Sequence, residues 1–180
     1  MRNDPAMVDT RSHERRARDA YDTPEWCVER LLDNFTFDTH VWEPCAGRGN
    51  ISGVLRRYGY DVYESDIRTG LNFLGFSKRA PGRDIKHNQI ITNPPYALAK
   101  EFIEQALAMA WPYGRVAMLL RNEYDCAKSR KHLWDLPFSH KLVLTKRPMW
   151  IEGTTGSPRH NFSWFLWDWN YESTPTIQYA

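Results

Sequence analysis

Residues 40–66 read HVWEPCAGRGNISGVLRRYGYDVYESD and contain a strand, a helix and a second strand in succession. Residues 40–43 are a short run with an apolar centre, and residues 51–58 repeat apolar side chains at helical spacing. Residues 60–65 form the second strand, which ends immediately before Asp66. Because two strands joined by one helix run parallel in the same sheet, this unit predicts an α/β fold.

The same alternation of strands and helices continues on both sides of this unit. The other predicted elements are helices over 24–34, 97–110 and 125–135, and strands over 88–92, 115–120, 141–145 and 163–169. Thr23 is expected to cap the first helix, with Pro24 at its first position. The order predicts a Rossmann-like, mostly parallel sheet with helices on both faces, in which ligands bind at the carboxyl ends of the strands.

Length and composition predict one globular domain. The chain has 180 residues, of which 42% are hydrophobic and 14% aromatic, so it is unlike a disordered chain. We expect residues 1–20 to form a flexible polar arm and residues 21–180 a single domain without a separate target-recognition domain. No apolar run approaches the ~18 residues of a membrane span, and no secretory signal is visible. The three cysteines are widely spaced, which predicts a cytoplasmic protein without disulfides or a bound metal.

The loop between the first strand and its helix has the features of a cofactor site. Gly47 and Gly49 lack a Cβ atom, which lets a ligand approach the backbone closely. Asp66 follows the second strand, where an acid can accept hydrogen bonds from both hydroxyls of a ribose. The loop lacks the spacing of dinucleotide and nucleoside triphosphate sites, and Glu43 suits a ligand with a cationic amino-acid part. S-adenosylmethionine, with an ammonium, a sulfonium and a ribose, meets these demands; a glycine turn without a ligand is the alternative.

A second loop, Asn93–Tyr96 or NPPY, follows a strand of the buried type. Its two prolines stiffen the turn and remove two N–H donors. The Asn93 side-chain oxygen and the Pro94 carbonyl can together accept both hydrogens of a planar NH₂ group, which localises the nitrogen lone pair for attack. Tyr96 can stack on the ring that carries the amine. The loop therefore predicts transfer of a group to an exocyclic amine.

With these motifs in this order, the chain resembles the class I S-adenosylmethionine-dependent methyltransferases, and within them the DNA amino-methyltransferases that modify adenine N6 or cytosine N4. The first motif is matched by residues 43–49, the cofactor acid by Asp66 and the catalytic motif by NPPY. The similarity runs from about Tyr21 to Trp169 and is greatest to small phage-type adenine methyltransferases that end in an aromatic strand, here 161–168. It implies a seven-stranded sheet whose last strand is antiparallel, and direct in-line methyl transfer.

The resemblance also implies a set of site residues. The catalytic residues are expected to be Asn93, Pro94, Pro95 and Tyr96. The residues expected to bind S-adenosylmethionine are Tyr21, Thr23, Pro24, Glu43, Pro44, Cys45, Ala46, Gly47, Gly49, Asp66, Ile67, Asp84 and Asn93. A position in a surface turn is an equally open interpretation of Asp84, and a position in the core is an equally open interpretation of Ile67. Cys45 is not expected to be a nucleophile, because it lies in the cofactor loop and not beside the target base.

We expect the substrate to be a nucleic acid, above all DNA, with the target base flipped from a duplex or taken from a single strand. The candidates for substrate contacts are Phe162, Arg121, Lys128, Arg130, Lys131 and Arg159. Phe162 is expected in the loop before the aromatic strand, where it would face a flipped base opposite Tyr96. The cations over 121–147 can hold phosphates, although a solvated helix face explains the same pattern. An adenine in RNA, a glutamine amide in protein and a binding module without turnover remain open, as does the oligomeric state.

Overall fold

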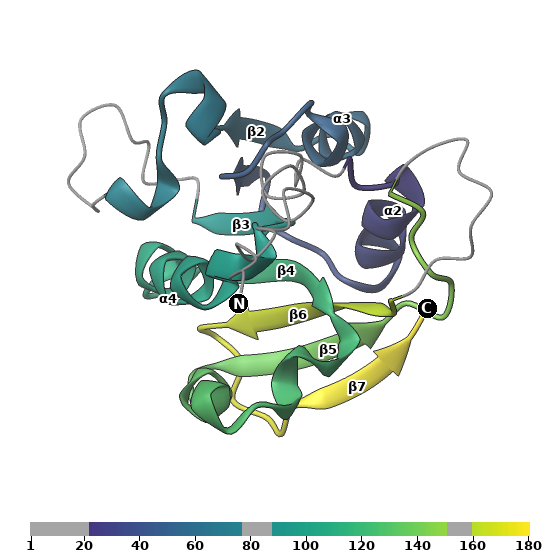
Figure 1. Cartoon of the computed structure of the whole chain (residues 1–180), viewed down its shortest axis with the longest axis vertical. Coiled ribbons are helices and arrows are strands. Elements are labelled where there is room, and N and C mark those ends of the chain that lie inside the picture. The colour runs from purple at the N-terminus through teal and green to yellow at the C-terminus, as the bar shows by residue number, and fades with distance from the viewer. Residues whose placement is uncertain (1–21, 77–87, 151–159) are drawn as a thin grey trace, which may run out of the picture.

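The fold is built on a seven-stranded sheet, shown in Figure 1. The computed structural model describes residues 22–76, 88–150 and 160–180. The strands are β1 His40–Glu43, β2 Asp61–Glu64, β3 Gln89–Thr92, β4 Arg115–Arg121, β5 Phe138–Val143, β6 Phe162–Asp168 and β7 Thr176–Tyr179. Their order across the sheet is β2-β1-β3-β4-β6-β5-β7, and β6 runs antiparallel to both of its neighbours while the other adjacent pairs are parallel. The predicted α/β class with a mostly parallel sheet is confirmed.

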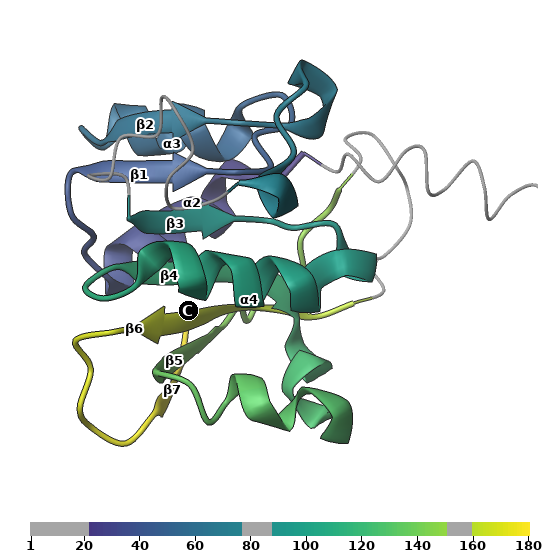
Figure 2. The same ribbon diagram turned by 90° about the vertical axis from the view of Figure 1, so that its left-hand side faces the viewer.

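Helices cover both faces of the sheet, and Figure 2 shows α4 in front of the strands with α2 and α3 behind them. The helices span Glu25–Asn34 (α2), Asn50–Arg57 (α3) and Ala99–Ala110 (α4). Successive side chains of a strand point to opposite faces, so each strand supplies both cores. Val41 and Ile91 pack in the core that contains α2 and α3, whereas their neighbours Trp42 and Ile90 pack in the core that contains α4.

The first helix begins one residue later than predicted. Pro24 occupies the cap position, with φ −57° and ψ 135°, and the helix starts at Glu25. Thr23 does not cap the helix, because its hydroxyl oxygen accepts a hydrogen bond from the Asn93 side chain instead. Thr23, which the local sequence predicts as a helix cap, therefore joins the start of α2 to the loop after β3.

The segment after β4 also differs from the prediction. In place of one helix over 125–135, it forms two 3₁₀ turns, Asn122–Cys126 and Lys128–Leu133, separated by an extended Ala127. The Lys141 ammonium donates to the Asn122 carbonyl at 2.7 Å and to the Asp125 carboxylate at 2.6 Å. These bonds from β5 hold the first 3₁₀ turn against the sheet. The two short turns take the place of a continuous helix.

The last strands depart from the predicted boundaries. β5 covers 138–143 and not 141–145, because Phe138 pairs with Trp167 and Val143 with Ser163 on β6. β7 was not predicted as an element, and three of its four residues are exposed. The antiparallel strand is β6, and β7 follows it in the chain as an edge strand parallel to β5. Phe162 lies inside β6, opposite Arg121, and not in the loop before it.

At Gly114, in the turn between α4 and β4, the surrounding backbone leaves no room for a side chain. Its N–H donates to the Ala110 carbonyl at 2.7 Å. A Cβ atom at this position would collide with the carbonyl oxygens of Asn88 and Ala110. The close approach of three backbone segments therefore requires glycine here.

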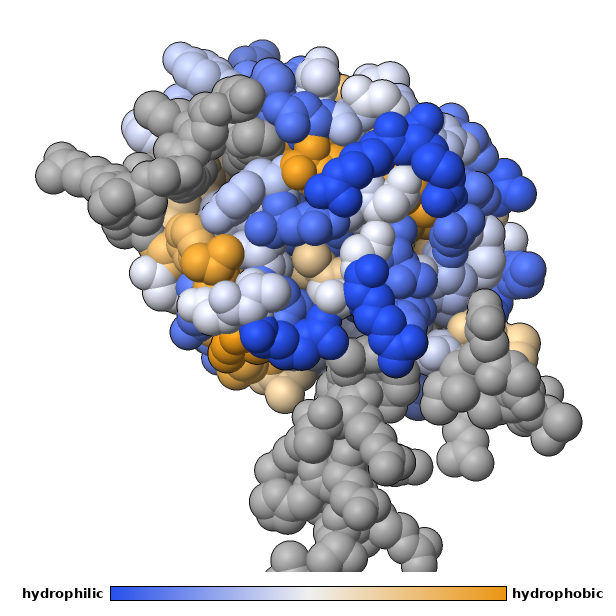
Figure 3. Space-filling view, turned by 90° about the horizontal axis from the view of Figure 1, so that it is seen from above, coloured by the Kyte–Doolittle hydropathy of each residue, from blue (hydrophilic) through white to orange (hydrophobic). Residues whose placement is uncertain are grey.

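The outer surface is largely polar where Figure 3 displays it. Seen from above the β2 edge, hydrophilic side chains dominate and hydrophobic ones form small separate groups. Within the described ranges, no helix has both the length and the apolar character needed to cross a bilayer.

Candidate functional site

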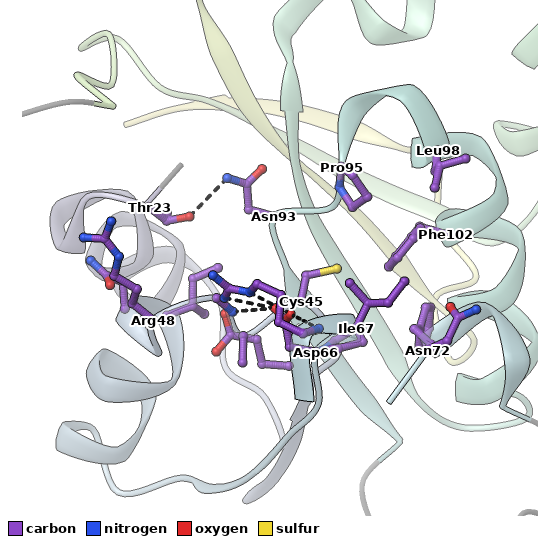
Figure 4. A pocket seen from close by; sticks show the side chains of 18 of the residues that line it. Thr23, Cys45, Arg48, Asp66, Ile67, Asn72, Asn93, Pro95, Leu98 and Phe102 are labelled. Carbon is purple, nitrogen blue, oxygen red and sulfur yellow. Dashed lines mark hydrogen bonds and ion pairs between the residues drawn. The ribbon is translucent and has the colours of Figure 1, made fainter. Parts of the chain in front are cut away.

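A cavity of about 390 Å³ opens at the carboxyl ends of β1, β2 and β3, which is within the size range of small-molecule sites. Figure 4 shows its lining side chains. The lining residues are Asp22, Thr23, Glu43, Pro44, Cys45, Ala46, Gly47, Arg48, Asn50, Ile51, Asp66, Ile67, Arg68, Asn72, Phe73, Leu74, Asn93, Pro95, Leu98 and Phe102. The cavity thus joins the two loops that the sequence singles out, as expected for the carboxyl edge of a parallel sheet.

The glycines of the first loop are needed for its backbone conformation. Gly47 and Gly49 have φ values of +57° and +83°, in the left-handed region that other residues avoid. A Cβ at Gly47 would be in ordinary contact with Arg68 at 3.5 Å, so crowding is not the reason for glycine. Gly47 lines the cavity, whereas Gly49 lies outside its lining and forms the cap position of α3.

Glu43 is a buried acid at the end of β1, with 1% of its surface exposed. Its Oε2 atom accepts a hydrogen bond from Ser52 N at 2.8 Å and another from the Ser52 hydroxyl, which ties β1 to the start of α3. Burial raises the pKa of Glu43 to about 8, even though the Ser52 bonds favour the charged form. At neutral pH the carboxyl is therefore mostly protonated until a cation approaches it.

Asp66 is the second acid of the cavity, and it is ionised. Its carboxylate accepts hydrogen bonds from Gly47 N at 2.9 Å, and from Arg68 N and Nε, each at 2.9 Å. Burial opposes ionisation, but the bonds from Arg68 and Gly47 outweigh it and lower the pKa of Asp66. The site therefore holds one charged and one largely neutral carboxyl at neutral pH. The Arg68 partner could not be predicted from the sequence pattern.

The end of the cavity beyond Asp66 is apolar. Ile67 is 72% exposed and points into this space, so its alternative role as a core residue is excluded. Phe73 and Leu74 come from the irregular segment after β2, and Leu98 and Phe102 from the start of α4. No sequence pattern pointed to these four residues as part of the site, because only their tertiary placement brings them together.

Asn93 lies between the first loop and the N-terminal segment. Its Nδ2 atom donates to the Thr23 hydroxyl oxygen at 3.2 Å, and Figure 4 shows the side-chain oxygen turned away from that bond. Among the described residues nothing donates to this buried oxygen. An unsatisfied buried acceptor costs free energy, and among the described side chains that line the cavity this makes Oδ1 a candidate acceptor for a donor on a ligand.

The rest of the NPPY loop presents a carbonyl and an aromatic ring. The Pro95 carbonyl accepts a hydrogen bond from Leu98 N at 2.9 Å, whereas no described backbone N–H donates to Pro94. The Tyr96 ring centroid lies 5.7 Å from that of Phe162, with the planes tilted by 39°. Phe162 is only 2% exposed and is also packed against Trp150, so no gap for a base exists between it and Tyr96.

Cys45 lines the cavity but is a poor nucleophile. Burial raises the pKa of its thiol to about 12, so the thiolate is rare at neutral pH. This supports the interpretation that Cys45 is a small lining residue. Among the described residues, no three histidine, cysteine, aspartate or glutamate side chains gather in a way that could hold a metal ion.

The predicted basic cluster is only partly available for phosphate. Arg130 donates to the Tyr124 carbonyl at 2.8 Å and stacks on the same residue's ring. Lys131 is paired with Asp135 at 2.7 Å. Arg121 and Lys128 are exposed, but neither they nor the other two line the cavity.

Several predicted site residues lie elsewhere. Pro24, Gly49, Pro94 and Tyr96 flank the cavity without lining it. Tyr21, Asp84 and Arg159 fall outside the described residues, as does the arm over 1–20. Asp22 and Arg48 were not among the predicted site residues, and they form a salt bridge of 3.0 Å at the cavity.

No protein-family profile matches the chain, and no curated protein matches it in sequence. Solved structures do match. A candidate class I S-adenosylmethionine-dependent methyltransferase from Listeria monocytogenes has a TM-score of 0.57 and 12% identity, covering 90% of this chain and 66% of that protein. Magnesium protoporphyrin IX methyltransferase from Synechocystis PCC 6803, solved with bound S-adenosylmethionine, has a TM-score of 0.51 and 15% identity over 92% of this chain and 100% of that one. The type IIG restriction endonuclease BpuSI has a TM-score of 0.59 and 12% identity over 83% of this chain and 24% of that one.

The chain thus spans just under two thirds of the Listeria protein and about a quarter of BpuSI. At such low identity the similarity concerns the fold. This chain has the Rossmann-like fold of the class I S-adenosylmethionine-dependent methyltransferases.

Proposed function

We propose that this chain is an S-adenosylmethionine-dependent methyltransferase that acts on an exocyclic amine, with adenine N6 in DNA as the favoured target. The observation that carries the proposal is the buried Asn93 oxygen, which lacks a donor among the described residues beside a cavity with two acids. The fold adds support, because its solved neighbours include methyltransferases, one of them with S-adenosylmethionine bound.

The residues of the cavity fit the proposed cofactor. Asp66 is ionised and suits the two hydroxyls of a ribose. To admit the ribose, the Arg68 side chain has to turn away from the Asp66 carboxylate or share it. Ile67, Phe73 and Phe102 offer apolar surface to the adenine ring. Glu43 is protonated when alone, and a nearby ammonium favours its charged form. When bound, S-adenosylmethionine supplies an electrophilic methyl group on its sulfonium.

The NPPY loop is suited to hold the methyl acceptor. Thr23 fixes the Asn93 amide through Nδ2, so that Oδ1 is the atom left to accept from an amine. The Pro94 carbonyl provides a second acceptor on a stiff turn. Acceptors fixed in advance stabilise the positive charge that develops on the attacking nitrogen. Tyr96 is the aromatic ring next to them and the candidate for stacking on the base, a role that Phe162 cannot share in this arrangement.

A nucleic acid is the substrate class that these features favour. An aromatic ring beside paired acceptors suits a planar base better than a flexible glutamine side chain. The neighbour BpuSI is a restriction endonuclease, which is compatible with a role on DNA. An adenine in RNA is the second candidate, because the loop itself does not read the sugar.

Methyl transfer from labelled S-adenosylmethionine to DNA, RNA and protein, measured in parallel, tests the proposal. We expect label in DNA, recovered as N6-methyladenine by mass spectrometry of the digested nucleosides. Asn93→Ala should abolish incorporation while calorimetry still detects cofactor binding. Asn170→Ala is a matched control, because Asn170 is exposed and its side chain donates to the Tyr113 carbonyl, away from the cavity. Incorporation by Asn93→Ala at the native rate would refute the proposed role of the loop.

A further inference from the structure

A second pocket lies on the same edge of the sheet as the cavity. It has a volume of about 350 Å³ and is formed by one side of α2, the turn after β5 and the end of β7. The residues that line it are Trp26, Arg30, Asn34, Thr145, Lys146, Tyr179 and Ala180. Among the described lining residues there is no aspartate or glutamate, and two of them, Arg30 and Lys146, are cationic.

Two of these side chains are available to a ligand. The Lys146 ammonium lies 5.1 Å from the centre of the Trp26 ring, and no salt bridge joins it to a described carboxylate. The Tyr179 side chain is 71% exposed on an edge strand. Arg30 is paired with Asp33 at 3.0 Å and contributes less free charge. An exposed aromatic ring beside a cation without a carboxylate partner is the combination that binds single-stranded nucleic acid, through base stacking and phosphate contact.

The sheet sets the spacing between this pocket and the NPPY loop. β5 is parallel to β3 and three places away in the strand order, and β7 is one place further. With neighbouring strands about 4.8 Å apart, Asn93 and the end of β5 are separated by roughly 14 Å along the same edge. A base held at Asn93 would therefore have flanking nucleotides within reach of Lys146 and Tyr179.

We infer that this second pocket binds a single-stranded segment of the nucleic acid that flanks the target base. Lys146 contacts a phosphate, and Tyr179 stacks on a base. The inference rests on the proposed function for the choice of ligand, but it assigns a separate surface that takes no part in methyl transfer. It also singles out Lys146 among the cations over 121–147, of which Arg130 and Lys131 are engaged within the protein.

Fluorescence anisotropy with a dye-labelled, mixed-sequence single-stranded oligodeoxynucleotide tests the inference without any turnover. We expect Tyr179→Ala to weaken binding by about five-fold or more. Lys146→Ala should make the slope of log affinity against log salt shallower by roughly 0.7, the value for one phosphate contact on a single strand. Lys146→Arg keeps the charge and should bind within about two-fold of the native protein.

Tyr113→Ala is the matched aromatic control. Tyr113 is 69% exposed, close to the value for Tyr179, but it precedes β4 and so lies at the opposite edge of the sheet. Its substitution should leave oligonucleotide affinity unchanged. Circular dichroism of each variant shows whether it is folded, and ultraviolet cross-linking of the native protein should attach the oligonucleotide to the peptide that contains Tyr179.

The outcomes separate this inference from the proposed function. Weakened binding in Tyr179→Ala and Lys146→Ala, but not in Tyr113→Ala, supports the pocket even if no methyl group is transferred to DNA. Equal affinity in all variants, equal loss in Tyr113→Ala, or cross-links confined to other peptides overturns it, even if DNA is methylated. An RNA oligonucleotide of the same sequence runs in parallel, and stronger binding to RNA keeps the pocket while changing the substrate.

Discussion

The Thr23 hydroxyl and the Asn93 side-chain amide, seventy positions apart in the chain, are joined by a hydrogen bond of 3.2 Å. The bond uses Nδ2 of Asn93 and so determines which end of the amide remains for a ligand. Thr23 itself is 4% exposed and cannot exchange this partner easily for water. The N-terminal segment therefore orients the acceptor of the NPPY loop.

Thr23→Val should lower the rate of methyl transfer by about five-fold, the effect of losing one hydrogen bond of about 1 kcal/mol. The valine keeps the size of the side chain, so cofactor affinity by calorimetry should change little. Thr23→Ser restores the hydroxyl and should recover most of the rate. A Thr23→Val enzyme with the native rate would show that Asn93 is oriented by other contacts.

Asp66→Asn should weaken S-adenosylmethionine binding by about ten-fold or more, because a charged acceptor of several hydrogen bonds is lost. The matched variant is Arg68→Ala, which removes the ion pair but keeps the carboxylate. It should bind the cofactor at least as well as the native protein, since no arginine then competes for Asp66. Calorimetry of both variants makes the comparison, and a greater loss in Arg68→Ala than in Asp66→Asn would contradict it.

Glu43 should make stability depend on pH. Its pKa in the folded protein is about 8, against 4.5 for an ordinary glutamate, so between these values the folded state binds more protons than the unfolded state. The stabilisation is complete below the lower value and is lost as pH rises toward 8. The native protein should therefore lose up to about 1 kcal/mol per pH unit relative to Glu43→Gln, which remains neutral.

Urea unfolding of the two proteins between about pH 5 and pH 8 measures this difference. Glu64→Gln is the control, because the bonds from Arg56 and Ser52 outweigh desolvation and lower the pKa of Glu64. The Glu64 contribution is lost only on acidification below this range, so the difference between the native protein and Glu64→Gln should stay nearly constant from about pH 5 to pH 8. A constant difference between the native protein and Glu43→Gln across the range would mean that Glu43 is already charged in the folded state.

Gly114→Ala should destabilise the protein by about 1–3 kcal/mol, because its Cβ collides with two backbone carbonyls that cannot move independently. Gly53→Ala provides the contrast. Gly53 lies inside α3, and a Cβ atom there would meet nothing within 4 Å, so alanine should stabilise the helix by about 0.5–1 kcal/mol. Thermal unfolding of both variants checks the two signs together, and similar shifts in both would refute the packing argument.

Local patterns were enough to predict the fold class and the two loops. The strand–helix–strand unit over 40–66 and the strand before NPPY each carry their own periodicity and turn residues. Their meeting at one cavity follows from the parallel sheet, because parallel strands end at the same edge. The positions of Glu43, Gly47, Asp66 and Asn93 at that cavity could therefore be anticipated.

Features that depend on contacts distant in sequence were not predictable. Phe73 and Leu74 lie in a segment without hydrophobic periodicity, and only the packing against α4 brings them to the cavity. The partners of Arg68 and Lys131 decide whether these cations are available to a ligand, and a sequence shows charges but not their pairing. Thr23 matches the preferences of a helix cap, but a tertiary hydrogen bond overrides them.

The reversed direction of β6 has a consequence for how this protein can be extended. β5 ends and β6 begins at the edge of the sheet where Asn93 lies, so the connection between them starts and finishes at the same edge as the NPPY loop. Extra chain grafted between these two strands would lie over the carboxyl edge with the cavity and would interrupt no ladder of the sheet. The scaffold thus offers an insertion point at which a sequence-reading module can be acquired while both hydrophobic cores stay intact.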